Sequence, residues 1–143
     1  MSVRFTLNGA AAEHPGGETL LHALRGAFGL NGPRYGCGAE ACGACHVLLD
    51  GASVPSCALP VEAAAGRAVV TAEALDPRLA RAFEAEQAGQ CGYCLTGILV
   101  SAAALLARDP RPDEDAVRAA LQPHLCRCGS HGRILRAVAR AAA

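Results

Sequence analysis

The fold is decided by one stretch of sequence, residues 36–45, which reads Gly36-Cys37-Gly38-Ala39-Glu40-Ala41-Cys42-Gly43-Ala44-Cys45. Its three glycines exclude a regular helix or strand, because glycine weakens both kinds of element. A further cysteine, Cys57, follows after eleven residues, so four thiols lie within a short length of chain. This pattern predicts a loop wrapped around a bound group.

The spacing of the first three cysteines, Cys37-x4-Cys42-x2-Cys45, is that of plant-type [2Fe–2S] proteins. A centre held by four thiolates carries net negative charge, and glycines let backbone N–H groups approach its sulfurs. A structural zinc site is the alternative, because Cys42-x2-Cys45 alone is half of a zinc motif. Zinc is the weaker interpretation here, since Cys57 is distant and no second short pair completes the set.

The sequence around this loop predicts short strands and one helix. Apolar residues alternate with polar ones from Val3 to Leu7, and Asn8-Gly9 then gives a strong hairpin signal. Leucines recur at helical spacing behind Thr19, a residue type that caps helix N-termini. The expected elements are a hairpin from residue 3, a helix at 18–30, and strands at 46–49, 52–57 and 67–71. Strands around a single helix predict a β-grasp domain over residues 1–73.

From residue 74 onward the apolar residues recur with the period of helices. Leu79 and Phe83 belong to one stripe and Ala102 and Leu105 to another, while Asp109-Pro110 ends the second helix. A third helix is expected from about residue 113 to 122, and a fourth carries Ile134, Leu135 and Val138 inward. The sequence therefore predicts an α+β chain, with a bundle of four short helices over residues 74–143.

A second cysteine set falls in this helical half, as the pairs Cys91-x2-Cys94 and Cys126-x-Cys128. Each pair lies just before a predicted helix, whose positive N-terminal end stabilises a bound anion. Two short pairs also suit a tetrahedral zinc ion, so zinc stays open on local spacing. A thioredoxin-like redox role is a weak interpretation, because that motif needs a βαβ neighbourhood.

The composition limits the classes of function. The chain has 143 residues, of which 52% are apolar, and this is typical of one folded domain or two very small ones. Thirteen arginines balance thirteen acidic residues, and zero net charge excludes the basic surface of a nucleic-acid or anionic-membrane binder. Residues 1–5 lack the pattern of a signal peptide, and the apolar run 98–107 is too short to span a membrane. We therefore expect a cytoplasmic protein whose clustered cysteines bind metal.

Taken in chain order, six motifs carry a resemblance to one family. They are Gly36-Cys37-Gly38, Cys42-Gly43-Ala44-Cys45, Val47-Leu48-Leu49-Asp50-Gly51, Ser56-Cys57, Gln90-Cys91-Gly92-Tyr93-Cys94 and Cys126-Arg127-Cys128. Together they resemble the iron–sulfur subunit of molybdenum hydroxylases, the superfamily of xanthine dehydrogenase and aldehyde oxidoreductase. The resemblance covers nearly the whole chain and includes all eight cysteines. It implies a plant-ferredoxin-like β-grasp domain and a four-helix domain, each holding one [2Fe–2S] cluster through four of these cysteines.

The resemblance also assigns roles near the second set. Gln90 matches a glutamine that hydrogen-bonds the molybdopterin cofactor held by a large catalytic subunit. Cys128 matches the cluster ligand closest to that pterin. Position alone would make Gln90 an ordinary polar residue at a helix end. Arg127 is expected to face the cluster, the partner or solvent.

Three departures from the family pattern leave every ligand in place. His46 stands where threonine is common, Leu95-Thr96-Gly97 replaces a residue-Pro-Gly run, and Gly129-Ser130-His131 replaces Thr-Gly-Tyr. The last of these is more similar to the branch that acts on N-heteroaromatic compounds such as nicotinate or isoquinoline. The five histidines have no metal-like spacing, and we expect them to be structural or surface residues.

The function implied is electron transfer without bond chemistry in this chain, so no catalytic residue is expected. The large molybdopterin-binding catalytic subunit is the expected partner, with a cytochrome, a quinone or a FAD-containing flavin subunit to accept the electrons. A free-standing ferredoxin-like carrier is the alternative. Such carriers usually have a strongly acidic docking surface, and the zero net charge disfavours one here.

Overall fold

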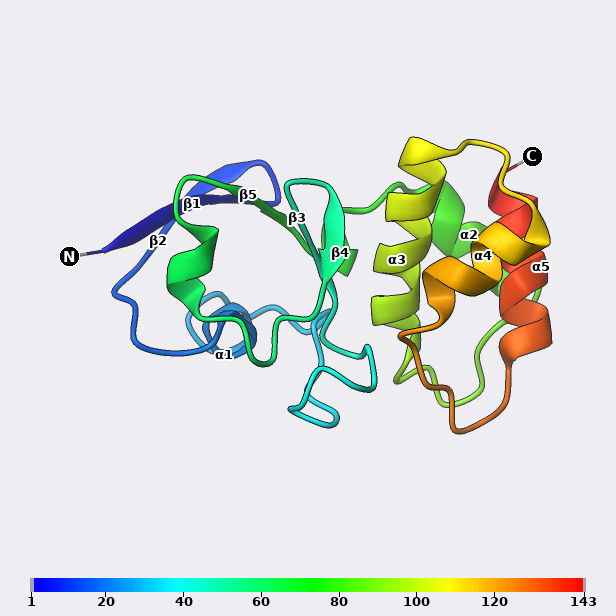
Figure 1. The fold of residues 1–143 in the computed structure, drawn as a ribbon, viewed down its shortest axis with the longest axis horizontal. Coiled ribbons are helices and arrows are strands. Elements are labelled where there is room, and N and C mark those ends of the chain that lie inside the picture. The colour runs from blue at the N-terminus through cyan, green and yellow to red at the C-terminus, as the bar shows by residue number, and fades with distance from the viewer. Residues whose placement is uncertain (1, 143) are drawn as a thin grey trace.

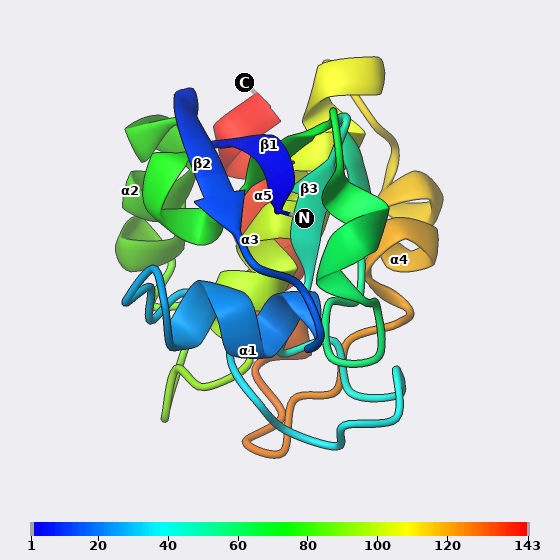
Figure 2. The same cartoon turned by 90° about the vertical axis from the view of Figure 1, so that its left-hand side faces the viewer.

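A five-stranded mixed sheet forms the first half of the chain in the computed structural model, which describes residues 2–142. Its spatial order is β2-β1-β5-β3-β4, with β1 parallel to β5 and the other neighbours antiparallel. The strands are β1 (Val3–Leu7), β2 (Ala10–His14), β3 (Val47–Leu49), β4 (Ala52–Val54) and β5 (Ala68–Val70). Helix α1 (Leu20–Arg25) lies across one face of this sheet, as a β-grasp fold requires (Figure 2).

The first hairpin forms as its sequence predicts. Val3, Phe5 and Leu7 are buried while the residues between them are exposed, so one face of β1 covers the core. Asn8 and Gly9 both have positive φ, 50° and 84°, which is the geometry of a tight two-residue hairpin turn.

Helix α1 is shorter than the predicted span of 18–30, and the expected C-terminal boundary is wrong. The Thr19 hydroxyl accepts a hydrogen bond from the His22 N–H at 3.2 Å, so the predicted N-cap is confirmed. The helix already ends at Arg25, with Gly26 as its C-cap. Phe28, beyond the end of the helix, still packs against the core, with its ring centre 5.7 Å from that of Phe5. This burial explains why an apolar residue stands there at helical spacing from the leucines of α1.

Four α-helices follow, and they confirm the predicted bundle. They are α2 (Pro77–Ala85), α3 (Leu95–Arg108), α4 (Glu114–Leu121) and α5 (His131–Ala142). Asp76 and Asp113 cap α2 and α4 through their side chains. Two short 3₁₀ turns, Val61–Ala64 and Ala72–Ala74, were not expected from the sequence. Among residues 2–142, no helix combines the length and the apolar character that crossing a bilayer demands.

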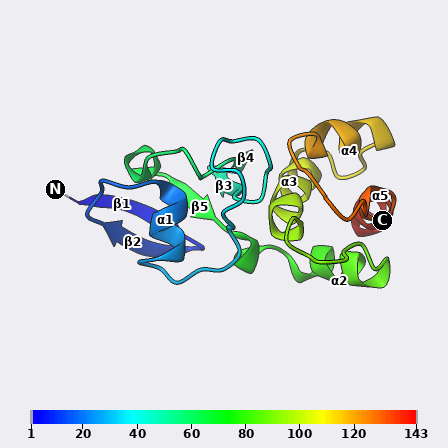
Figure 3. The same cartoon turned by 90° about the horizontal axis from the view of Figure 1, so that it is seen from below.

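The two halves lie side by side, and α3 forms the boundary between them (Figures 1 and 3). One side of α3 contacts β3 and β4, and its other side packs into a helical core around Phe83, Ile98 and Ile134. At Gly97 the approach is so close that an added Cβ would lie 2.0 Å from the carbonyl oxygen of Gly43. The N-terminal turn of α3 therefore rests directly on the backbone of the first cysteine loop.

Candidate metal centres

The first cysteine set lies in the loop between α1 and β3 and in the turn after β4. Cys45 and Cys57 are buried against Leu21, Cys42 is half-buried and Cys37 is exposed. All four sulfurs accept hydrogen bonds from backbone N–H groups. The donors are Ala39 and Ala41 to Cys37 (3.3 and 3.2 Å), Cys37 and Ala44 to Cys42 (3.4 and 3.5 Å), Ser56 to Cys45 (3.2 Å) and Glu40 to Cys57 (3.4 Å).

This environment favours negative charge on the exposed side of the set and disfavours it on the buried side. The N–H groups of Ala39 and Ala41 lower the pKa of Cys37 to about 7. Burial instead raises the pKa of the Cys45 thiol. Gly36 has no room for a side chain, because its Cβ would lie 2.6 Å from the Cys42 sulfur. The loop is thus a cradle of backbone donors closed tightly around sulfur.

The second cysteine set lies where two loops lead into helices, as predicted. Cys91 and Cys94 precede α3, and Cys126 and Cys128 precede α5. The Tyr93 N–H, 3.5 Å from the Cys91 sulfur, lowers the pKa of that thiol, and Cys128 lowers it further. Burial, reinforced by Cys126, raises the pKa of Cys94 to about 12. Both helix N-termini favour an anion at this place.

Within each set the thiols lie close enough to perturb one another's pKa in pairs. After the larger effects of backbone N–H groups and burial, Cys42 acts on the pKa of Cys37, Cys57 on that of Cys45, Cys128 on that of Cys91, and Cys126 on that of Cys94. A tetrahedral zinc ion needs four ligands that converge on one point. Two adjacent pairs suit a two-iron centre, in which each iron takes two thiolates. The donor sets therefore fit [2Fe–2S] clusters better than single ions.

The two cysteine loops also touch one another. The Leu125 N–H, next to Cys126, donates to the carbonyl oxygen of Cys42 at 3.0 Å. On the exposed side, the Arg34 guanidinium donates to the carbonyl oxygens of Gly92 and Tyr93 at 2.6 and 3.0 Å. It also lies 5.4 Å from the centre of the Tyr93 ring. The loops of the two sets thus form one continuous region.

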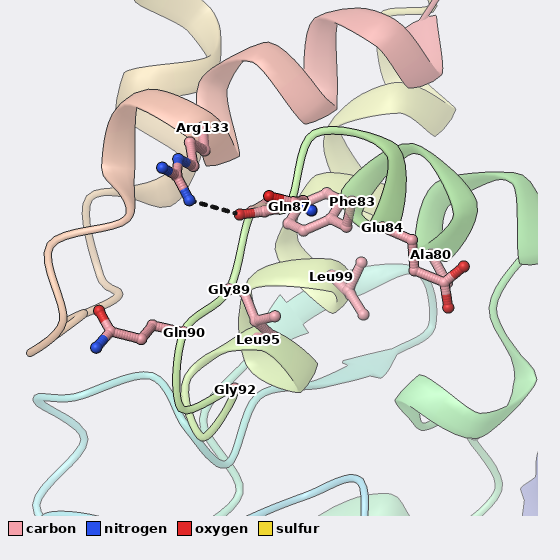
Figure 4. A pocket seen from close by; sticks show the side chains of 11 residues that line it. Ala80, Phe83, Glu84, Gln87, Gly89, Gln90, Gly92, Leu95, Leu99 and Arg133 are labelled. Atoms are coloured by element: carbon pink, nitrogen blue, oxygen red, sulfur yellow. Dashed lines mark hydrogen bonds between the residues drawn. The ribbon is translucent and has the colours of Figure 1, made fainter.

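Gln90 is exposed and lies between two hollows of the helical half. One is a pocket of about 570 Å³ whose floor includes Phe83, Leu95 and Leu99, and Figure 4 shows the Gln90 side chain pointing away from that floor. The other, of about 410 Å³, holds Cys128 beside Gln90 and is more polar. The structure therefore places Gln90 and Cys128 together at an accessible surface.

Two of the histidines that were expected to be structural or surface residues meet in the interior. His46 and His124 are buried, and their ring centres are 4.6 Å apart. Burial lowers the pKa of His46, and burial together with His46 lowers the pKa of His124 to about 4. No spacing rule connects residues so far apart in the sequence, so only the fold reveals this contact.

Comparison with known proteins supports both halves of this description. Residues 5–74 match the family described as "2Fe-2S iron-sulfur cluster binding domain", and residues 69–139 match the "[2Fe-2S] binding domain" family. The α+β fold of a ferredoxin-like domain followed by a helical domain is thereby confirmed. The chain also superposes on the crystal structure of quinoline 2-oxidoreductase from Pseudomonas putida 86 with a TM-score of 0.93 and 34% identity, covering 99% of this chain and 93% of that one.

Two relatives of similar length belong to enzymes of N-heteroaromatic compounds. One subunit of the nicotinate dehydrogenase of Pseudomonas putida is 50% identical over 128 residues, which are 86% of this chain and 82% of that protein. The alpha subunit of isoquinoline 1-oxidoreductase from Brevundimonas diminuta is 42% identical over 147 residues, 98% of this chain and 97% of that protein. With its two cysteine sets and these relatives, the chain belongs to the small [2Fe–2S] subunits of the molybdenum hydroxylase family.

Proposed function

We propose that this chain is the electron-transfer subunit of a molybdenum-containing hydroxylase. In this role it carries electrons from a molybdopterin centre in a large catalytic subunit, through two [2Fe–2S] clusters, to a flavin, cytochrome or quinone acceptor. The observation that carries the proposal is the gathering of eight free cysteines in two adjoining loops, where backbone N–H groups donate to their sulfurs. The complex is an oxidoreductase, and the nicotinate and isoquinoline enzymes among the relatives favour an N-heteroaromatic substrate.

The residues proposed as ligands divide between the two domains. Cys37, Cys42, Cys45 and Cys57 hold one cluster in residues 1–73, and Cys91, Cys94, Cys126 and Cys128 hold the other in residues 74–143. When bound, each cluster takes up and releases one electron at a time. The chain itself supplies N–H donors to sulfur and sets the burial of each site, and these properties tune the potential. None of its residues makes or breaks a substrate bond in this proposal.

Gln90 and Cys128 are proposed to face the large subunit, because they share an accessible hollow. The Gln90 side-chain amide offers both a donor and an acceptor to the pterin there. A cytoplasmic location belongs to the same proposal, supported by eight free cysteines in clustered positions.

A free-standing ferredoxin-like carrier is the alternative function. It gains no support from the charge, which is zero overall, because carriers of that kind dock through strongly charged surfaces. The two relatives described above are subunits of larger enzymes. Purification of a stable iron-loaded monomer from the native host, without a large subunit bound to it, would favour the carrier.

Chemical analysis of the assembled complex is expected to give about four irons and four acid-labile sulfides per copy of this chain, because each cysteine set holds two irons. Full reduction should produce two distinct electron paramagnetic resonance signals, since one set lies in a glycine-rich loop and the other at helix N-termini. Saturation at about two irons, or stoichiometric zinc, would contradict the proposal.

Gln90→Ala is expected to weaken retention of the molybdenum cofactor while both clusters stay loaded. The lost contact leaves a pterin group without its partner, at a cost of about 1–3 kcal/mol. Molybdenum content, bleaching of cluster absorbance by substrate, and steady-state turnover would be measured together. The matched control is Gln122→Ala, an exposed glutamine at the end of α4 and outside both hollows beside Gln90. If Gln90→Ala equals the control in all three measurements, the contact with the cofactor does not exist.

A further inference from the structure

A continuous chain of polar side chains crosses the boundary between the two halves. The His46 Nδ1 lies 2.7 Å from the Ser53 hydroxyl, and that hydroxyl lies 2.7 Å from the Ser101 hydroxyl. The Ser101 hydroxyl in turn lies 2.6 Å from the His124 Nε2. All three distances are those of good hydrogen bonds. We call these four residues the boundary chain.

The boundary chain is buried and both of its hydroxyls are hydrogen-bonded on two sides, whereas the His124 Nδ1, which lies outside the three links, has no hydrogen-bond partner within residues 2–142. His46, Ser101 and His124 each expose 6% or less of their surface, and Ser53 is half-buried. Three links between four groups require three hydrogens, of which the two hydroxyls supply two. One neutral imidazole therefore donates along the chain and the other accepts. Loss of either hydroxyl leaves buried polar atoms unpaired, which is costly in a low-dielectric interior.

Its four members come from four different segments, and its ends adjoin both cysteine sets. His46 follows Cys45 directly, and His124 precedes Cys126 by two residues. Ser53 lies on β4 and Ser101 on α3, the two elements that face each other across the boundary. The His124 ring also fills the space beside Gly43, where a Cβ would lie 2.3 Å from its Nδ1.

We propose that the boundary chain is a positioning device that fixes the separation of the two cysteine sets, and with it the magnetic and electronic coupling between the clusters they hold. This inference rests on the proposed function. Apolar packing between α3 and the sheet resists separation but allows sliding, whereas directed hydrogen bonds define one arrangement. Ordinary packing alone would tolerate the loss of a single hydroxyl without moving either loop.

The test compares variants of Ser53 in the assembled complex. Ser53→Ala removes the central link, while Ser53→Thr keeps the hydroxyl on a residue type suited to a strand. After full reduction, each cluster is expected to split the electron paramagnetic resonance signal of the other. This splitting should be smaller in Ser53→Ala than in the wild type, and Ser53→Thr should show the wild-type splitting. Ser101→Ala should have the same effect as Ser53→Ala. Iron content should stay at the wild-type value in all three variants.

The matched control is Thr96→Val. This variant removes a buried hydroxyl from α3, the helix that carries Ser101, but Thr96 does not belong to the boundary chain. Its splitting should equal that of the wild type. Unchanged splitting in Ser53→Ala at full iron content would overturn the inference while leaving the proposed function intact. Fewer than four irons in the wild type would instead refute the proposed function. If Ser101→Ala does not assemble, the two Ser53 variants decide the question.

Discussion

Gly97→Ala is expected to loosen the whole boundary between the two domains and to cost the chain much of its iron. The new methyl group would lie 2.0 Å from the Gly43 carbonyl oxygen, so α3 and the first cysteine loop would have to move apart. Such overpacking costs about 3 kcal/mol, which lowers the temperature of cluster loss by roughly 6–12 °C. Iron content and the thermal loss of visible absorbance measure both effects in the assembled complex.

The control for this variant is Gly132→Ala in α5. Gly132 is also a helical glycine, but the nearest heavy atom to its added Cβ is 3.8 Å away, at the flexible end of Arg136. Alanine is the better helix former by up to about 1 kcal/mol, so Gly132→Ala should be neutral or stabilising. Wild-type iron content and thermal behaviour in Gly97→Ala would show that α3 does not approach the loop this closely.

Cys42→Ser is expected to separate substrate chemistry from turnover. The serine oxygen is a harder and more basic ligand than thiolate, so the cluster of the first domain should be lost or should fall out of redox range. Substrate should still reduce the molybdenum centre in a single turnover. Steady-state turnover should fall by at least the ~10–100-fold that loss of support for a metal ligand costs.

Ala41→Ser serves as the control for Cys42→Ser, because it adds an exposed hydroxyl next to the ligand and removes none. Rapid-reaction spectroscopy measures how fast substrate reduces the molybdenum centre. Turnover with an artificial acceptor measures how fast electrons then leave the complex. Wild-type turnover in Cys42→Ser would mean that electrons leave the complex without passing through the first domain.

Much of the fold and the candidate site could be predicted because their signals are local. The hairpin at Asn8-Gly9 and the end of α3 at Asp109-Pro110 each depend on residues within one turn of chain. The cysteine spacings are local signals as well. The first set lies in an irregular loop and the pairs of the second set lie just before helices α3 and α5, as their sequences predict. The predicted helix is longer than α1 because Phe28 keeps the helical spacing, although the backbone has already left the helix at Gly26.

What could not be predicted depends on contacts between distant segments. The proximity of Cys91 to Cys128 depends on how the helices of the second half pack together, and the contact of His46 with His124 depends on the packing of α3 against the sheet. The close approach of Gly97 to the Gly43 backbone could not be predicted either. In the sequence, a glycine within a helix indicates only lower helix stability. Periodicity describes which face of an element is apolar, but not which element covers that face.

The hydrogen bond from Leu125 to Cys42 has a consequence for the order in which this protein can mature. The partner of the Cys42 carbonyl is synthesised about eighty residues later, which takes roughly 4–17 seconds at about 5–20 residues per second. During that interval the growing chain holds the first cysteine loop without the segment that closes it. Final closure around that loop must therefore wait until the chain has been synthesised through residue 125, so the domain that is made earlier is completed only together with the later one.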